Sequence, residues 1–274
     1  YAVIPTGITV DWGIQGKRSG SSFYTATRLT GNGYLATNST DAEGNASNLK
    51  LDSMDGYAPG IYNNVSYQGI LWSFKRSPKF MDVVCYRGDG LDRAIQRNLT
   101  VPPELLIFKN RTNGGHTAPD WAVRYVAADP TSTLFLNKTD AISNNYSYMW
   151  SSEAPTATSF QLSVDNYMTN SATGSEYIAY LFATLAGVSR VDSYTGTGAS
   201  LPLYMGFTGG ARFFLCKRTD ATGDWYLWDS VRGIVAGDDP YLLLNSSAAE
   251  VTNTDLVDPL AAGLTLTAAG SSTI

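Results

Sequence analysis

An internal repeat constrains this chain more than any other feature of its sequence. The apolar stretch "ELLIFKNR" (residues 104–111) is matched by "RFFLCKRT" (residues 212–219), and a polar turn and an aromatic stretch follow each of them. Three pairs of matching residues are each 108 positions apart: Tyr86 and Tyr194, Lys109 and Lys217, Asn137 and Asn245. A constant spacing predicts tandem copies of one structural unit, and such a repeat decides the fold before local propensities do.

A looser copy precedes these two. Lys17 and Asn38 match Lys109 and Asn137 in type and order, at spacings of 92 and 99 residues. The sequence therefore predicts three units, which we call the first (residues 1–79), the middle (residues 80–187) and the third (residues 188–274). Compared with the middle unit, the first lacks an opening strand and the third lacks the closing stretch "YIAYLFA". We therefore expect the chain to be a piece of a longer protein.

The residue pattern indicates an all-β fold. Short runs rich in Val, Ile, Tyr, Phe and Trp alternate with turn residues at intervals of roughly 8–12 positions, which is typical of a β-sandwich or barrel. Roughly 100 residues per unit is enough for one packed antiparallel sandwich each. The best helical candidate is "DGLDRAIQRNL" (residues 89–99), but its copy contains Pro202. We therefore expect a loop or an edge strand in both places.

Charge and hydropathy exclude several classes of partner. The formal net charge is −5, which argues against a nucleic-acid partner, because nucleic acids are bound by basic surfaces. No stretch is long and apolar enough to predict a membrane span. The junctions at residues 75–80 and 185–190 are short, so we expect the units to lie close together.

Few residues are suited to catalysis or metal binding. His116, the single histidine, lies in a glycine-rich turn, and Cys85 and Cys216 occupy non-equivalent positions. We therefore expect free thiols, no zinc site and no cofactor. Glycoside cleavage needs two carboxylates at one site, and no such pair recurs in the three units, so we expect a non-enzymatic protein. The turns "GDGLD" and "GDDP" contain oxygen ligands for calcium but lack the EF-hand spacing.

The densest aromatic patch, "DWYLWDSVRG" (residues 224–233), is the best binding candidate. Alternation along a strand predicts that Trp225 and Trp228 point to opposite faces, with at most one of them exposed. A tryptophan face can stack on a pyranose while acids and arginine bind its hydroxyl groups. The candidate glycan-binding residues are Trp228, Asp229, Arg232, Asp238 and Asp239. The alternative is that the tryptophans of the repeated strand fill the core.

The repeat resembles a family of tandem domains of unknown function from phage structural proteins, often described in marine phages and cyanophages as tail-fibre proteins. "ELLIFKNR", "RFFLCKRTDATGDWYLWDSVRG" and "YIAYLFA" carry the resemblance. It covers residues 80–274 well and residues 10–80 more loosely. It implies concanavalin-A-like or jelly-roll sandwiches, and it supplies no catalytic residues.

The resemblance implies a virion protein of the phage tail, either a tail fibre or another tail-associated appendage. Its expected partners are other virion proteins, copies of itself in a homotrimer, and a glycan on the bacterial surface. Three alternatives stay open: a capsid decoration or fibre protein, a tail-spike polysaccharide depolymerase, and a secreted adhesin.

Overall fold

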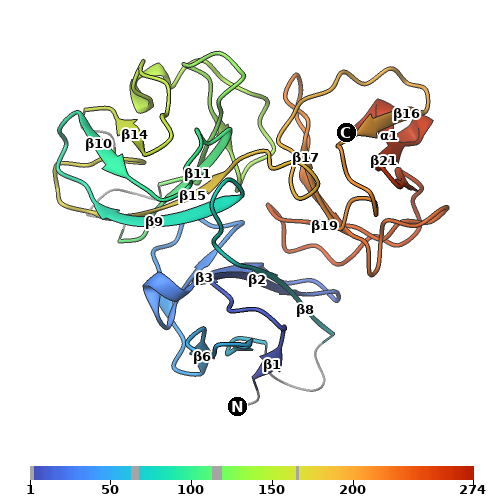
Figure 1. Ribbon diagram of the computed structural model, residues 1–274, viewed down its shortest axis with the longest axis horizontal. Coiled ribbons are helices and arrows are strands. Elements are labelled where there is room, and N and C mark those ends of the chain that lie inside the picture. The colour runs from blue at the N-terminus through green and yellow to red at the C-terminus, as the bar shows by residue number, and fades with distance from the viewer. Residues whose placement is uncertain (1–2, 63–67, 113–118, 165–166) are drawn as a thin grey trace.

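The computed structural model describes residues 3–62, 68–112, 119–164 and 167–274, and its regular structure is almost entirely antiparallel β-strand. Three lobes surround a common centre, with the first unit in blue, the middle in green and the third in orange and red (Figure 1). The helical segments are η1 (Arg28–Thr30), η2 (Ser147–Met149) and α1 (Ala268–Thr273). Within the described ranges, no helix has the length and apolar character needed to cross a membrane. The all-β prediction is confirmed.

The first unit contains a five-stranded and a three-stranded sheet. Its strands are β1 (Ile4–Pro5), β2 (Trp12–Lys17), β3 (Tyr24–Thr27), β4 (Gly33–Ala36), β5 (Gly44–Asn45), β6 (Leu49–Lys50), β7 (Gly56–Pro59) and β8 (Gly69–Phe74). The larger sheet has the order β5-β4-β3-β2-β8, and the smaller has the order β1-β7-β6.

The middle unit has a five-stranded and a two-stranded sheet. Its strands are β9 (Met81–Arg87), β10 (Arg93–Gln96), β11 (Leu105–Asn110), β12 (Ala122–Tyr125), β13 (Leu134–Phe135), β14 (Ser159–Leu162) and β15 (Glu176–Phe182). The larger sheet has the order β13-β12-β11-β15-β9, and β10 pairs with β14.

The third unit has two three-stranded sheets. Its strands are β16 (Leu201–Tyr204), β17 (Phe213–Lys217), β18 (Trp225–Asp229), β19 (Leu242–Leu243), β20 (Val257–Leu260) and β21 (Gly263–Leu266). The sheet orders are β17-β18-β19 and β16-β21-β20. The stretches expected to be loops or edge strands around residues 89–99 and 198–207 contain the edge strands β10 and β16.

Strand register shows which residues of the three units are equivalent. Three pairs hold the same place in the units: Tyr24 with Ala36, Ala122 with Phe135, and Tyr226 with Leu243. The preceding strands β2, β11 and β17, which we call the inner strands, place Gln15, Phe108 and Cys216 opposite Tyr24, Ala122 and Tyr226. The same three-strand arrangement therefore occurs three times.

This register corrects one sequence correspondence. Gly16, not Lys17, occupies the place of Lys109 and Lys217. A β-carbon on Gly16 would lie 2.1 Å from the ring of Phe23, so a side chain cannot occupy this place in the first unit without displacing that ring. The difference is not visible in the sequence, because a lysine followed closely by an arginine occurs in all three units. It matters structurally, because a shift of one residue moves a side chain to the other face of a strand.

The outer edge of the inner strand differs between the units. The strands β8 and β15, which we call the closing strands, cover the edges of β2 and β11 along their whole lengths. In the third unit, β17 is an edge strand, and no described residue pairs with it on that side. Its side chains are accordingly less buried than those of β2 and β11.

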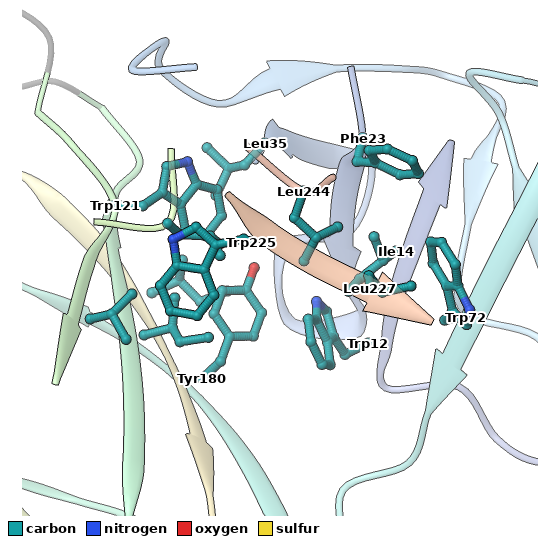
Figure 2. Close-up of a cluster of buried hydrophobic side chains, with 14 of the residues drawn as sticks. Trp12, Ile14, Phe23, Leu35, Trp72, Trp121, Tyr180, Trp225, Leu227 and Leu244 are labelled. Atoms are coloured by element: carbon teal, nitrogen blue, oxygen red, sulfur yellow. The ribbon is translucent and has the colours of Figure 1, made fainter. Parts of the chain in front are cut away.

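Both faces of the larger sheets are buried. In the middle unit, Leu106 and Phe108 pack with Ile95, Phe160 and other residues of the small sheet. The alternate residues of these strands, such as Ile107, join a central cluster shared by all three units. Figure 2 shows Trp12, Trp121, Tyr180, Trp225 and Leu244 of this cluster. Burial on two faces explains why stretches such as "LLIF" (residues 105–108) are continuously apolar instead of alternating.

The units join head to tail in a closed ring. Equivalent backbone N–H groups donate across the three boundaries: Glu43 to the Arg111 carbonyl at 2.7 Å, Ile142 to Thr219 at 2.9 Å, and Glu250 to Arg18 at 2.9 Å. The donors are 99 and 108 residues apart and the acceptors 93 and 108, which are the offsets between equivalent residues. Because the third unit donates back to the first, the head-to-tail contact closes after three copies.

Side chains repeat the same relationship at two of the boundaries. Trp121 Nε1 donates to the Ala36 carbonyl at 3.0 Å, and Trp225 Nε1 donates to the Phe135 carbonyl at 2.8 Å. At the boundary between the first and third units, the equivalent residue is Phe23, whose ring has no N–H to donate. There Thr37 Oγ1 donates to the Leu244 carbonyl at 2.6 Å.

Candidate functional site

Trp228, the centre of the predicted glycan site, lies in the core. Its exposed fraction is 0%, and its ring stacks on Phe214 and Tyr226 at centroid distances of 5.7 Å, with Tyr241 at 5.4 Å. Trp225 points to the opposite face and joins the central cluster. The predicted alternation is confirmed, and neither tryptophan offers a ring face to solvent in this conformation.

Asp229 and Arg232 lie together at the boundary between the third and first units. Arg232 Nη2 contacts Asp229 Oδ2 at 2.6 Å, and Arg232 Nη1 forms a second ion pair with Glu250. Trp72 Nε1 of the first unit donates to Asp229 Oδ2 at 3.0 Å. These side chains therefore have protein partners, and they connect two units of the ring.

Sequence reasoning missed Glu250, which has the central place in this ion-pair network. Its carboxylate also binds Arg18 Nε at 2.6 Å, and its side chain is only 3% exposed. No local pattern pointed to it, because Arg18 is 232 residues away in the sequence. The repeat is the signal that could have found it, since Glu250 has the same place as Glu43 and Ile142.

The two neighbouring aspartates of "GDDP" have different environments. Asp239 is fully buried and accepts backbone N–H groups from Leu256 at 2.7 Å and Val257 at 3.0 Å. Desolvation raises the pKa of Asp239 to about 6, although these hydrogen bonds act to lower this pKa. Asp238 is exposed. The five predicted residues thus form no common exposed surface, and Asp238 is the member that faces solvent.

The other candidate groups form no metal or redox centre within the described part of the chain. Cys85 and Cys216 are both free, and burial raises the pKa of the Cys216 thiol to about 11. No group of three or more histidine, cysteine, aspartate or glutamate side chains occurs there that could hold a metal ion. His116 lies outside the described residues.

A cavity of about 1560 Å³ lies along the outer edge of β17. It reaches the central cluster at Trp12, Ile107 and Tyr180, and its other side is the segment of residues 187–196. It is lined mainly by apolar side chains. Small-molecule pockets typically measure about 300–1,000 Å³, so this cavity is larger than one such ligand requires.

The cavity lies at the place in the third unit that corresponds to the closing strand β15 of the middle unit. In the middle unit, β15 lies between β11 and β9 and pairs with both. In the third unit, the cavity lies between β17 and the segment of residues 189–195, which is equivalent to β9. The absence of a second "YIAYLFA" was the sequence signal for this feature.

Comparison with known proteins yields a family but no described function. No curated protein and no solved structure matches the chain. A family model described as a domain of unknown function, DUF7483, matches residues 77–273, which is more than half of the chain. The chain therefore belongs to the DUF7483 family.

Proposed function

We propose that this protein is a non-enzymatic structural component of a phage particle, serving as a tail fibre or another tail-associated appendage. The link to phage rests on the sequence resemblance carried by "ELLIFKNR" and "YIAYLFA". The structural role is supported by one observation: three units of one chain bind one another head to tail through equivalent backbone groups. Such a ring is a rigid module, because each unit is held at two boundaries.

The finer fold class belongs to the same proposal. In the middle unit, Phe160 and Leu162 of the small sheet share one apolar core with Leu106 and Phe108 of the larger sheet. Two sheets packed face to face over a common core are what a β-sandwich requires. This packing in the middle unit supports the proposal that each unit is a sandwich of jelly-roll or concanavalin-A-like type.

The charged groups around β18 support a structural role better than a catalytic one. Asp229, Arg232 and Glu250 neutralise one another at a unit boundary, and Asp239 binds backbone N–H groups. A tail-spike depolymerase would need two carboxylates facing one substrate groove. It remains the enzymatic alternative, and release of reducing ends from a bacterial capsular polysaccharide would establish it.

Host-surface glycan binding is part of the proposal as a second role. Of the five candidate residues, Asp238 is the one that is exposed. A glycan array probed with the wild-type chain and with Asp238→Ala tests this role, and loss of the same glycan signals in the variant would support it. If the chain binds no glycan, the proposal would keep the structural role and lose the glycan-binding role.

Locating the chain in its source particle tests the main proposal. Mass spectrometry of purified virions should find its peptides, and cryo-electron microscopy should place its density at the tail periphery. Density on the capsid lattice would favour the decoration alternative, and a chain found only as a secreted bacterial product would favour the adhesin. Native mass spectrometry at micromolar concentration tests the proposed homotrimer.

A further inference from the structure

We infer that the first unit binds water inside its core, at a polar site formed by the amide of Gln15 and the hydroxyls of Tyr57 and Ser73. These side chains come from the strands β2, β7 and β8, so both sheets of the unit contribute to the site. The inference does not depend on the proposed virion function.

The first argument is that these polar groups are buried without protein partners. Gln15 is 1% exposed and Tyr57 is 0% exposed. Within the described ranges, Oε1 and Nε2 of Gln15 and the hydroxyls of Tyr57 and Ser73 are buried atoms that form no hydrogen bond. Buried polar groups in folded proteins are nearly always satisfied, either by protein groups or by ordered water. These four atoms therefore need partners that the described residues do not supply.

The second argument is that the four atoms lie around one place in the core. Ile14 points into the central cluster, so Gly13 and Gln15 point to the opposite face of β2. Ser73 is paired with Gly13 and shares that face. A β-carbon on Gly13 would lie 3.4 Å from the ring carbon of Tyr57 that carries the hydroxyl. The three polar side chains thus lie beside Gly13.

The spacing of these side chains suits a bridging water molecule. Directly paired residues on one face of an antiparallel sheet have β-carbons about 4.5–5.5 Å apart. One water molecule with two hydrogen bonds of about 2.8 Å spans such a separation. A buried water molecule typically makes about three hydrogen bonds, and the site offers four polar atoms.

The third argument comes from the repeat. Strand register gives three residues of the first unit apolar counterparts in the middle unit: Leu106 for Gly13, Phe108 for Gln15 and Leu181 for Ser73. All three counterparts belong to one buried apolar cluster. The first unit therefore has a smaller side chain at each of three adjoining core positions, and two of the three are polar. Tyr57 fills part of the space at Gly13, and water fills the rest in the proposed arrangement.

The donors and acceptors of the site point to water as its ligand. An amide and two hydroxyls carry no charge and both donate and accept hydrogen bonds, so the ligand is neutral and does both as well. Burial raises the pKa of Tyr57 above its usual value of 10.0, so its hydroxyl keeps its proton and can donate. Because Gln15 and Tyr57 are almost completely buried, the ligand is also small.

A high-resolution crystal structure of the full 274-residue chain tests the site directly. Ordered water should lie about 2.6–3.2 Å from polar atoms of at least two of the three side chains. In solution, magnetisation should pass from water to the side-chain amide protons of Gln15. Neither measurement needs a variant.

A variant with an apolar site tests the same water by another route. Oxygen-17 magnetic relaxation dispersion counts the long-lived water molecules inside a protein. The triple variant Gln15→Met, Tyr57→Phe, Ser73→Ala should hold at least one such molecule fewer than the wild type. Tyr86→Phe is the matched control, because the Tyr86 hydroxyl donates directly to the Thr169 carbonyl at 2.7 Å. Its removal should leave the water count unchanged.

Three outcomes would overturn the inference. One is a crystal structure in which the Gln15, Tyr57 and Ser73 side chains bind one another directly, with no water between them. Another is density at the site for a solute larger than water. The last is an equal water count in the wild type and the folded triple variant. If the triple variant does not fold, the crystal structure and the Gln15 amide signal of the wild type still decide the question.

Discussion

Trp225 of the third unit donates its indole N–H to the backbone carbonyl of Phe135 in the middle unit, at 2.8 Å. Trp121 binds Ala36 of the first unit in the same way. The donors are 104 residues apart and the acceptors 99, and each pair crosses one boundary of the ring. One kind of contact thus holds two of the three boundaries.

Replacing Trp225 by phenylalanine should weaken this boundary. The ring would stay in the central cluster, and the Phe135 carbonyl would lose the indole donor while keeping the Lys138 N–H at 3.2 Å. Loss of one such hydrogen bond typically costs about 0.5–1.5 kcal/mol. Denaturant unfolding of Trp225→Phe measures the loss. Phe23 holds the equivalent place in the first unit, so the ring itself is compatible with this position. A change below about 0.5 kcal/mol would show that the hydrogen bond contributes little.

Removing the Glu250 carboxylate should destabilise the boundary between the third and first units. Glu250→Ala would leave Arg232 with Asp229 as an acidic partner, and Arg18, whose side chain is 42% exposed, with solvent. No buried charge is left unpaired, so we expect a loss of about 1.5–3 kcal/mol, the usual range for hydrogen bonds to charged groups. The matched control is Asp220→Ala, because Asp220 and Arg218 form an exposed pair, and exposed ion pairs contribute little to stability. Equal losses in thermal unfolding would contradict a special role for Glu250.

Because of Lys109, the free energy of unfolding should depend on pH in the alkaline range. Desolvation lowers the pKa of its ammonium group from 10.5 to about 8, so between these values the folded chain binds fewer protons there than the unfolded chain. The free energy of unfolding should therefore rise with pH across this window, by about 1.4 kcal/mol per unit at most and about 3 kcal/mol in total.

The Lys109→Met variant isolates this effect, because every other titrating group is common to both proteins. The difference in unfolding free energy between wild type and variant, measured by denaturant titration from pH 8 to 10.5, should grow in favour of the wild type. Parallel pH profiles would mean that the Lys109 pKa is not lowered in the folded chain.

Gly16→Ala should be strongly destabilising, because the new β-carbon would lie 2.1 Å from the fully buried ring of Phe23. Overpacking of this kind typically costs about 1–3 kcal/mol. Gly209→Ala is the control, since no atom lies within 4 Å of its added β-carbon. Thermal unfolding should separate the two variants, and similar melting temperatures would show that Phe23 moves aside readily.

Features with a short period or a fixed spacing were predictable from the sequence. The 108-residue spacing placed Lys109 and Lys217 correctly, and alternation placed Trp225 and Trp228 on opposite faces. The predicted equivalence of Lys17 to Lys109 was wrong by one residue, because aligning the two lysines gave a better sequence match than the true strand register. Only strand pairing shows that Gly16 has this place.

The environment of the candidate glycan residues could not be predicted, because their partners are distant in the sequence. Asp229 looked available beside two tryptophans, but Trp72 binds it from 157 residues away. Asp239 looked like a turn residue, but it holds the backbone at Leu256 and Val257. Polar residues near aromatic ones are equally compatible with a sugar site and with a unit boundary, and only the folded structure distinguishes the two.

The closed ring also bears on how such a chain can change over time. In an open stack of repeats, a copy can be gained or lost at an end, whereas a ring that closes after three copies fixes their number. Three identical subunits must share every substitution, but three units of one gene need not. Phe23 stands where the other two units have tryptophan, and Thr37 makes the bond at that boundary. Within one covalent chain, one boundary can therefore differ from the other two while the ring stays closed.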